Sequence, residues 1–280
     1  MSIIITKKST NNFKMYFFCL VSHLIFDSIH IHNIDEIKSL KYVIKNDLNS
    51  KEIILVFLNT INYNSNNNLL FYIFDSYKCC NIIIDINYIN NIQKVITSFV
   101  PKSNQIIIFG LNIIYYLKIE ENDNNYLLKM ESKFSFETDM IVVDAKYIQN
   151  IKSNNINISD LIIVLFINNN ISIFDKKKKK IISTIMLRNY FNNKDKSNIN
   201  DLPFCLKRTI SPYGGNECFL IGTISGRIFL FSNDFSQKIM IYFIEEEIKE
   251  IKITESHSYI VSTKNNNLIL LNPYDGSINE

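Results

Sequence analysis

Short apolar segments separated by polar clusters recur along the whole chain. Each spans about five to eight residues, the common length of a β-strand. Asn-rich clusters such as 62–68 and 168–170 separate them, and Asn favours turns because it tolerates positive φ and can bond its own backbone. Long amphipathic helical patterns are nearly absent, so the sequence predicts an all-β fold. Clear examples of the apolar segments are 52–58, 68–74, 105–109, 112–117, 161–167, 170–174 and 227–231.

Residues 244–253 are the best candidate for a helix. The three apolar positions Ile248, Ile251 and Ile253 fit a helical face, but they fit a strand almost as well. In the second interpretation, Glu245, Glu246 and Glu247 form an acidic, solvated loop that leads into the strand.

An internal repeat links the apolar segments. Several strands end on an aromatic residue followed by a short polar one, as in Phe26-Asp27, Phe74-Asp75, Phe174-Asp175 and Phe231-Ser232. With related segments at 113–117 and 268–272, these endings recur every 40 to 57 residues. The longer intervals contain polar insertions near 150–157 and 189–200. Without the insertions, the period approaches the ~40–45 residues of a four-stranded β-propeller blade.

The clearest repeat unit contains strands at 204–209, 217–223, 227–231 and 237–243, with a Ser225-Gly226 turn between the second and third. The next unit has strands at 250–254, 258–263 and 268–272 but no room for a full fourth one. At the other end, a strand at 3–6 precedes the first unit without an obvious partner. Strands from both chain ends often complete a propeller ring and remove its exposed edges.

We therefore predict a single domain over residues 1–280, a β-propeller of about six four-stranded blades with partial terminal blades. Five or seven blades also fit the spacing. The alternative is a β-sandwich or a two-domain β arrangement, which would show two stacked layers in place of repeated units.

The segment Gly222-Thr223-Ile224-Ser225-Gly226-Arg227-Ile228-Phe229-Leu230-Phe231 resembles the hairpin between the second and third strands of a WD-repeat blade. The family's pattern there is Gly-small-x-Asp-Gly-x-Ile-x-Leu-Trp-Asp, and the Phe-Asp endings resemble its Trp-Asp with Phe in place of Trp. The chain departs from the family because it has no Trp and no Gly-His pair opening a unit. The family's Asp-His-Ser/Thr-Trp hydrogen-bond network therefore cannot be complete.

The resemblance implies structural roles for the motif residues. The aromatic side chain packs on the neighbouring sheet, and the following Asp bonds turn amides. The residues that the resemblance assigns to this blade motif are Phe26, Asp27, Phe74, Asp75, Phe174, Asp175, Gly222, Gly226 and Phe231.

Composition and charge leave one local feature of interest. Hydrophobic residues make up 47% of the chain and the net charge is +3, so the global charge does not favour a nucleic-acid or membrane partner. Five consecutive lysines follow Asp175 at a predicted strand-to-strand turn. In one interpretation they form a candidate interaction patch for phosphate, an acidic peptide or an import receptor. In the other they form a solvated turn that protects a sheet edge from aggregation. These lysines are Lys176, Lys177, Lys178, Lys179 and Lys180.

The N-terminal region contains an apolar stretch at 15–26. It is too short for the ~20 residues of a membrane-spanning helix, and no small-residue cleavage site follows it. Both a strand and a targeting segment remain open. The five cysteines include no Cys-x-x-Cys pair; an odd number without framework spacing indicates reduced thiols and a cytoplasmic or nuclear, intracellular protein.

The sequence offers no complete catalytic, cofactor or metal constellation. His30 and His32 would share one strand face, but only His23 and Asp27 lie nearby as further ligands. No Gly-x-Ser-x-Gly motif and no phosphate-binding Gly-rich loop occurs. We therefore predict no enzyme activity, no cofactor and no metal.

The predicted function is a non-catalytic scaffold or adaptor that presents propeller faces to other proteins within a larger complex. This prediction rests on the resemblance and on the lack of a catalytic motif, since fold does not fix function. The alternative is a nucleic-acid-associated propeller that binds through the Lys176 to Lys180 patch. A third hypothesis, an enzyme with an axial pocket, would need carboxylates or histidines clustered at the channel mouth.

Overall fold

The computed structural model describes most of the strands and the connections between the later ones. The chain divides into two compact units, Met1–Gly110 with Ile114–Lys133, and Leu111–Ile113 with Phe134–Glu280. We describe each unit by itself. The described residues are 2–9, 12–18, 25–32, 36–46, 52–61, 69–75, 78–81, 83–84, 92–97, 105–122, 125–148, 161–190 and 201–279.

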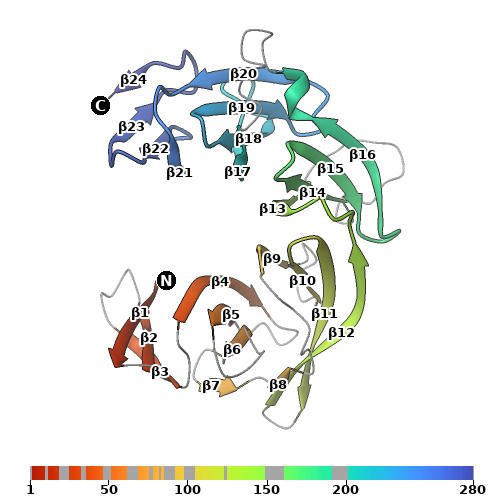
Figure 1. Ribbon diagram of the computed structural model, residues 1–280, viewed down its shortest axis with the longest axis vertical. Coiled ribbons are helices and arrows are strands. Elements are labelled where there is room, and N and C mark those ends of the chain that lie inside the picture. The colour runs from red at the N-terminus through yellow and green to blue at the C-terminus, as the bar shows by residue number, and fades with distance from the viewer. Residues whose placement is uncertain are drawn as a thin grey trace. The chain divides into compact units, whose positions relative to one another are not determined.

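The first unit contains three sheets (Figure 1). The first sheet has the order β1 (Ser2–Ser9), β2 (Asn12–Phe18), β3 (Ile25–His32). The second has the order β4 (Glu36–Asn46), β5 (Glu52–Ile61), β6 (Leu69–Asp75), β7 (Lys78–Asn81). Each strand pairs with its neighbour in sequence, which is the simple meander of a propeller blade.

The third sheet keeps the same meander and adds one short strand. Its order is β9 (Lys94–Thr97), β10 (Gln105–Phe109), β11 (Ile113–Asn122) and β12 (Asn125–Ser135), with β8 (Ile83–Ile84) parallel to β12. Residues 106–109 are fully buried. Their continuous apolar pattern reflects a central strand that is covered on both faces.

The second unit contains three further four-stranded antiparallel sheets in meander order (Figure 1). A 3₁₀ turn, η2 (Leu187–Tyr190), follows the first of them. The first sheet has β13 (Val142–Tyr147), β14 (Leu161–Phe166), β15 (Asn170–Asp175) and β16 (Lys180–Met186). The second has β17 (Pro203–Ile210), β18 (Glu217–Thr223), β19 (Arg227–Ser232) and β20 (Lys238–Phe243). The third has β21 (Ile248–Ile253), β22 (Tyr259–Thr263), β23 (Leu268–Leu271) and β24 (Ile278–Asn279).

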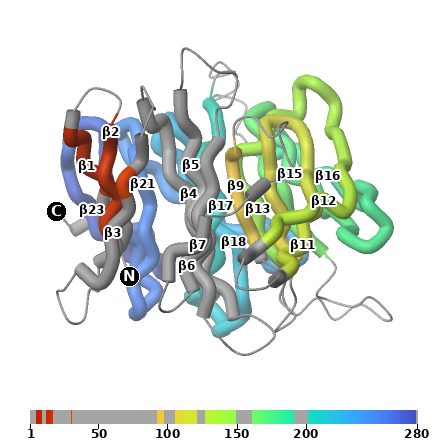
Figure 2. The backbone as a smooth tube through the Cα atoms, turned by 90° about the horizontal axis from the view of Figure 1, so that it is seen from below, coloured from red at the N-terminus to blue at the C-terminus, as the bar shows by residue number. Residues whose placement is uncertain are grey.

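Consecutive sheets of the second unit pack on one another. β13 and β17, the first strands of two sheets, lie side by side (Figure 2). β18 contacts β21 in the next sheet. Two apolar clusters fill the interfaces, one on each side of the β17–β20 sheet. Phe219, Phe229 and Phe231 point into the cluster shared with β13–β16, whereas Leu220 and Leu230 point into the cluster shared with β21–β24.

This two-sided burial explains the sequence pattern. Side chains alternate between the faces of a strand, so a strand covered on both faces is apolar at every position. β14 is buried throughout, whereas most positions of the outer strand β16 are exposed or half-buried. The repeated apolar runs of the sequence are therefore the middle strands of the sheets.

The structure confirms the all-β, blade-based prediction. The described strands form six sheets, and the described sheets at both ends of the chain are partial. The first sheet has three strands, and the fourth strand of the last sheet, β24, has only two residues. Within the segment 244–253, residues 248–253 form the strand β21, and residues 244–247 form the connection that leads into it rather than a helix. The prediction of one domain over 1–280 stays a prediction.

Some N-terminal predictions were wrong in detail. The segment 3–6 is not isolated, because β1 pairs with β2 along its length. The apolar stretch 15–26 is not one element, because it contains the end of β2 and the start of β3. Phe26 and Asp27 lie near the beginning of β3, not at its end. The polar insertion at 150–157 lies outside the described residues, and so does the insertion at 189–200 apart from residues 189 and 190, which end η2.

Candidate functional site

The hairpin between β18 and β19 contains the motif that the sequence singled out. Gly226 adopts φ +97°, and a Cβ at this position would lie 2.0 Å from the carbonyl oxygen of Ile244. The Ile244 N–H donates to the carbonyl of Gly226 (2.9 Å), and the Ile248 N–H donates to the carbonyl of Ile224 (3.2 Å). Only glycine allows this close approach, so Gly226 joins the hairpin tip to the segment that enters the next sheet.

Gly222 acts through packing rather than through backbone conformation. A Cβ there would lie 2.6 Å from Cδ1 of Ile251 and 2.9 Å from the ring of Phe204. Ile251 belongs to β21 in the next sheet. The absence of a side chain at Gly222 therefore makes room for the neighbouring sheet.

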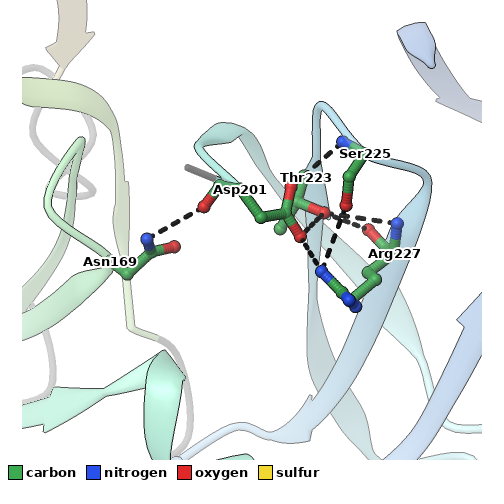
Figure 3. A network of polar contacts seen from close by, with 5 residues as sticks. All are labelled: Asn169, Asp201, Thr223, Ser225 and Arg227. Atoms are coloured by element: carbon green, nitrogen blue, oxygen red, sulfur yellow. Dashed lines mark hydrogen bonds and ion pairs between the residues drawn. The ribbon is translucent and has the colours of Figure 1, made fainter. Parts of the chain in front are cut away.

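A buried polar network surrounds this hairpin (Figure 3). Asp201 precedes β17, and its Oδ2 accepts hydrogen bonds from Nη1 of Arg227 (2.6 Å) and from the hydroxyl of Thr223 (2.8 Å). Its Oδ1 accepts the backbone N–H of Ser225 at 3.0 Å. Asp201 and Arg227 are only 3% and 6% exposed. A buried carboxylate is stable here because it has both a counter-charge and hydrogen-bond donors.

The same network reaches the preceding sheet. Asn169, in the turn between β14 and β15, donates through Nδ2 to the backbone carbonyl of Asp201 (2.9 Å; Figure 3). Asn169 has φ 66°, a conformation that Asn adopts more readily than most residues. The Asp201 network therefore connects two consecutive sheets.

The sequence did not reveal Asp201. It indicated that the WD-repeat Asp-His-Ser/Thr-Trp network is incomplete, and the structure instead joins Asp201, Thr223 and Arg227. A signal was available in Arg227, which is charged yet stands beside the apolar run 228–231. A charge in that position requires a partner, but the spacing does not tell which acid supplies it.

The Phe174-Asp175 pair ends β15. Phe174 is fully buried and packs edge-on against Phe134, with ring centroids 5.1 Å apart. Oδ1 of Asp175 accepts the backbone N–H of Lys178 at 2.8 Å, so the carboxylate caps the turn that follows the strand.

Phe231 occupies the corresponding place at the end of β19. It is fully buried and contacts Phe235 (5.4 Å) and Tyr190 (5.1 Å). Phe74 and Asp75 end β6. The side chains of Phe26, Asp27, Phe74 and Asp75 lie outside the described part of the structure.

Lys176 to Lys179 form the turn between β15 and β16, and Lys180 begins β16. Lys177, Lys178, Lys179 and Lys180 are exposed, whereas Lys176 is partly buried. Nζ of Lys178 lies 3.7 Å from Oδ2 of Asp175. The turn is therefore a solvent-facing positive patch that retains one carboxylate neighbour.

The described residues contain no group of three or more His, Cys, Asp or Glu side chains that could hold a metal ion. Likewise, no helix within the described ranges is long and apolar enough to cross a membrane. His30 is exposed on β3. Cys205 and Cys218 are free, buried thiols, and burial raises the pKa of each to about 12. Such thiols are poor nucleophiles at neutral pH.

Comparison with solved structures shows the fold. Raptor from Chaetomium thermophilum is similar with a TM-score of 0.58 at 10% identity, over 96% of this chain and 22% of the Raptor chain. BBS1N, from a structure of its complex with ARL6DN, is similar with a TM-score of 0.58 at 9% identity, over 91% of this chain and 71% of that chain.

Both neighbours contain propellers, and the chain accordingly has the blade-based fold of a β-propeller. The chain spans only about a fifth of the Raptor chain. No protein-family model matches the sequence. No curated protein matches it either.

Proposed function

We propose that this protein is a non-catalytic scaffold or adaptor, a degenerate WD-repeat-like propeller that binds other proteins within a larger complex in the cytoplasm or nucleus. The buried Asp201–Arg227 pair is consistent with this proposal, because it joins elements of the fold. The second neighbour's description as a complex with ARL6DN is consistent with this class of function.

The observation that carries the proposal is a set of exposed apolar side chains on the last two sheets. Phe243 at the end of β20 is 54% exposed, and Leu268 on β23 is 67% exposed. Leu270 (41%) and Ile278 (43%) are also accessible. Large apolar side chains that stay exposed on a folded sheet are candidates for protein-binding contacts.

The experiment is affinity capture of the intact chain after chemical cross-linking, with partners quantified by mass spectrometry. The double variant Phe243→Ser/Leu268→Ser should lose at least one stoichiometric partner of the wild-type protein. The control is Met186→Ser, an apolar residue 53% exposed on β16. Equal capture by wild type and both variants, or a wild-type chain without stoichiometric partners, would contradict the proposal.

A second candidate function is nucleic-acid association through Lys176 to Lys180. The observation in its favour is the exposure of four of these lysines on one turn. Binding through them should fall steeply with added salt, because cations are released from the nucleic acid. Replacing all five lysines with Ser should abolish it. Salt-insensitive binding to protein partners would favour the adaptor function instead.

A further inference from the structure

β16 is the outer strand of the β13–β16 sheet, and it is more exposed than the outer strand of the next sheet. Among the described strands it pairs only with β15, and five of its seven residues are exposed. By contrast, most positions of β20 are half-buried. Ile182 and Met186 of β16 are 43% and 53% exposed. An exposed strand edge of this kind can pair with a further strand.

The register of the β15–β16 pair shows which backbone groups of β16 face outward. The Leu187 N–H donates to the carbonyl of Asn169 (2.9 Å). Hydrogen-bonded and non-bonded residue pairs alternate along two antiparallel strands. Leu187 and Ile185 therefore direct their backbone groups toward β15, whereas Thr184 and Met186 direct theirs away from it.

A side-chain contact supports this assignment. The hydroxyls of Ser172 and Thr184, which are register partners, lie 2.9 Å apart, and side chains lie closest in the non-bonded pairs. Natural edge strands are usually protected by a charge, a proline or a bulge. β16 has a bulge near Ile182, at its beginning, but residues 183–187 contain neither a charge nor a proline. The edge at Thr184 and Met186 is therefore open to pairing.

Positive charge flanks this uncharged stretch at both ends. The exposed lysines at 177–180 precede it, and the exposed Arg188 follows it. Two copies of β16 would pair poorly, because antiparallel pairing about Thr184 places Lys180 opposite Arg188, and parallel pairing places the two lysine turns together. Like charges that face each other across strands are destabilising. The charges therefore favour an acidic strand over a second copy of this chain.

We propose that the β16 edge binds an extended segment of a partner protein, which adds as a fifth strand to the β13–β16 sheet and carries acidic residues on both sides of a short uncharged run. In strand addition, main-chain hydrogen bonds supply affinity, here through Thr184 and Met186. The acidic residues contact the lysine turn and Arg188, which selects the segment and its register. The inference rests on the adaptor function and specifies the chemistry of one partner segment.

The experiment uses the purified full chain and a fluorescent peptide with two Glu, the run Thr-Val-Thr-Val-Thr, and two further Glu, measured by anisotropy. One matched peptide has N-methyl groups on the five central residues, which removes main-chain donors and keeps every side chain and charge. A second has Lys in place of the four Glu. Amide hydrogen exchange of the wild-type protein, with and without the first peptide, locates the binding site.

Two variants of Thr184 test the main-chain contact. Thr184→Pro removes an outward N–H without removing a hydrogen bond to β15, since proline is tolerated where the N–H faces solvent. Thr184→Val is the matched control, because it also loses the hydroxyl contact with Ser172 but keeps the N–H. Met186→Ser keeps both backbone groups of that residue, so it should bind as the wild type does.

A second pair of variants tests the charge. Lys177→Gln/Lys180→Gln removes two of the exposed lysines beside the edge. Lys249→Gln/Lys252→Gln removes the same charge from two exposed positions of β21 and is the control.

We expect saturable binding of the Glu peptide, with slower amide exchange at Thr184 and Met186. The N-methylated peptide and the Thr184→Pro variant should each bind about tenfold more weakly, and the Lys peptide should not bind. Lys177→Gln/Lys180→Gln should weaken binding severalfold, whereas Thr184→Val and the β21 control should not. The peptide comparisons and the exchange data use the wild-type protein, so they test the site even if a variant fails to fold.

No saturable binding, equal binding of the N-methylated or Lys peptide, or protection at residues outside β16 would overturn the proposal. Tighter, competing binding of a nine-nucleotide single strand would overturn it too, because the lysine turn would then be a nucleic-acid site. Partner capture by the intact chain is a separate measurement. Retained partners without peptide binding would contradict only the strand addition, whereas peptide binding without stoichiometric partners would contradict only the adaptor function.

Discussion

Arg227 and Asp201, 26 residues apart in sequence, form an ion pair 2.6 Å long whose side chains are 7% and 0% exposed. Each partner also contacts the β18–β19 turn, Asp201 through the Ser225 N–H and Arg227 through the Ser225 hydroxyl. The pair thus attaches the segment before β17 to the β18–β19 turn, which lies at the same end of the sheet.

Removing one member of this pair should be strongly destabilising. Asp201→Asn or Arg227→Met leaves an uncompensated buried charge, which typically costs about 3–5 kcal/mol. Urea unfolding followed by circular dichroism measures the loss. The double variant should be less destabilised than the sum of the single ones, because it leaves no unpaired charge.

The exposed pair between Lys264 and Glu247 provides the control for this prediction. Its side chains are 63% and 51% exposed, and exposed pairs contribute about 0–1 kcal/mol. Glu247→Gln should therefore shift the unfolding midpoint little. An equally small shift for Asp201→Asn would contradict the structural role of the network.

The two turn glycines Gly226 and Gly215 should differ in their tolerance of a side chain. Gly226→Ala combines positive φ with a clash against the Ile244 carbonyl and should cost about 3 kcal/mol or more. Gly215 also has positive φ (+67°), but no atom lies within 4 Å of its Cβ position, so Gly215→Ala should cost only about 1 kcal/mol. Thermal unfolding compares the two. Equal losses would show that the close approach at Gly226 is not formed.

These examples indicate what the sequence could predict. The β18–β19 hairpin was predictable, because two apolar runs flank Ser225-Gly226 and the pattern is local. The Asp201–Arg227 pair was not, since nothing in a single sequence connects two charges across an intervening strand. The pairing of β1 with β2 was missed because the apolar stretch at 15–26, although it favoured buried strands, gave no sign of where one strand ends and the next begins.

The candidate site likewise contains features that local sequence predicts and features that depend on long-range contacts. A run of lysines directly after a strand predicts the positive turn at Lys176 to Lys180. An aromatic residue at the end of an apolar run predicts the burial of Phe231. The contact between Asn169 and the Asp201 carbonyl depends on two sheets that pack together only in the folded chain, so the sequence gives no sign of it.

The buried thiols should make the protein sensitive to alkaline pH. The pKa of Cys205 is raised from 9.0 to about 12 in the folded state, mainly by burial. Its contribution to stability is fully present below about pH 9 and is lost as the pH rises toward 12, since the unfolded chain releases the proton first. The unfolding midpoint should therefore fall over this window.

Cys205→Ser removes this titration and should make the alkaline decline shallower. At pH 8, iodoacetamide should modify Cys205 and Cys218 only after unfolding, as peptide mass spectrometry can show. Rapid alkylation of either residue in the native protein would contradict their burial.

Asp175 should stabilise its turn through the carboxylate rather than through the neighbouring lysines. Asp175→Ala removes the acceptor for the Lys178 N–H and should cost about 1 kcal/mol. Lys178→Ala keeps the backbone donor and loses only an exposed contact, so it should change stability by less than half as much. The reverse order, measured by urea unfolding, would argue against the cap.

The central claim is that consecutive blade sheets pack face to face, and the contact between Gly222 and Ile251 tests it most directly. Cδ1 of Ile251 lies next to Gly222 and the Phe204 ring, although Ile251 belongs to one sheet and the other two residues to the preceding sheet. In a protein with labelled isoleucine methyl groups, the Ile251 methyl should show nuclear Overhauser effects to the Gly222 α-protons and the Phe204 ring protons. An Ile251 methyl that shows neither effect would contradict blade-on-blade packing.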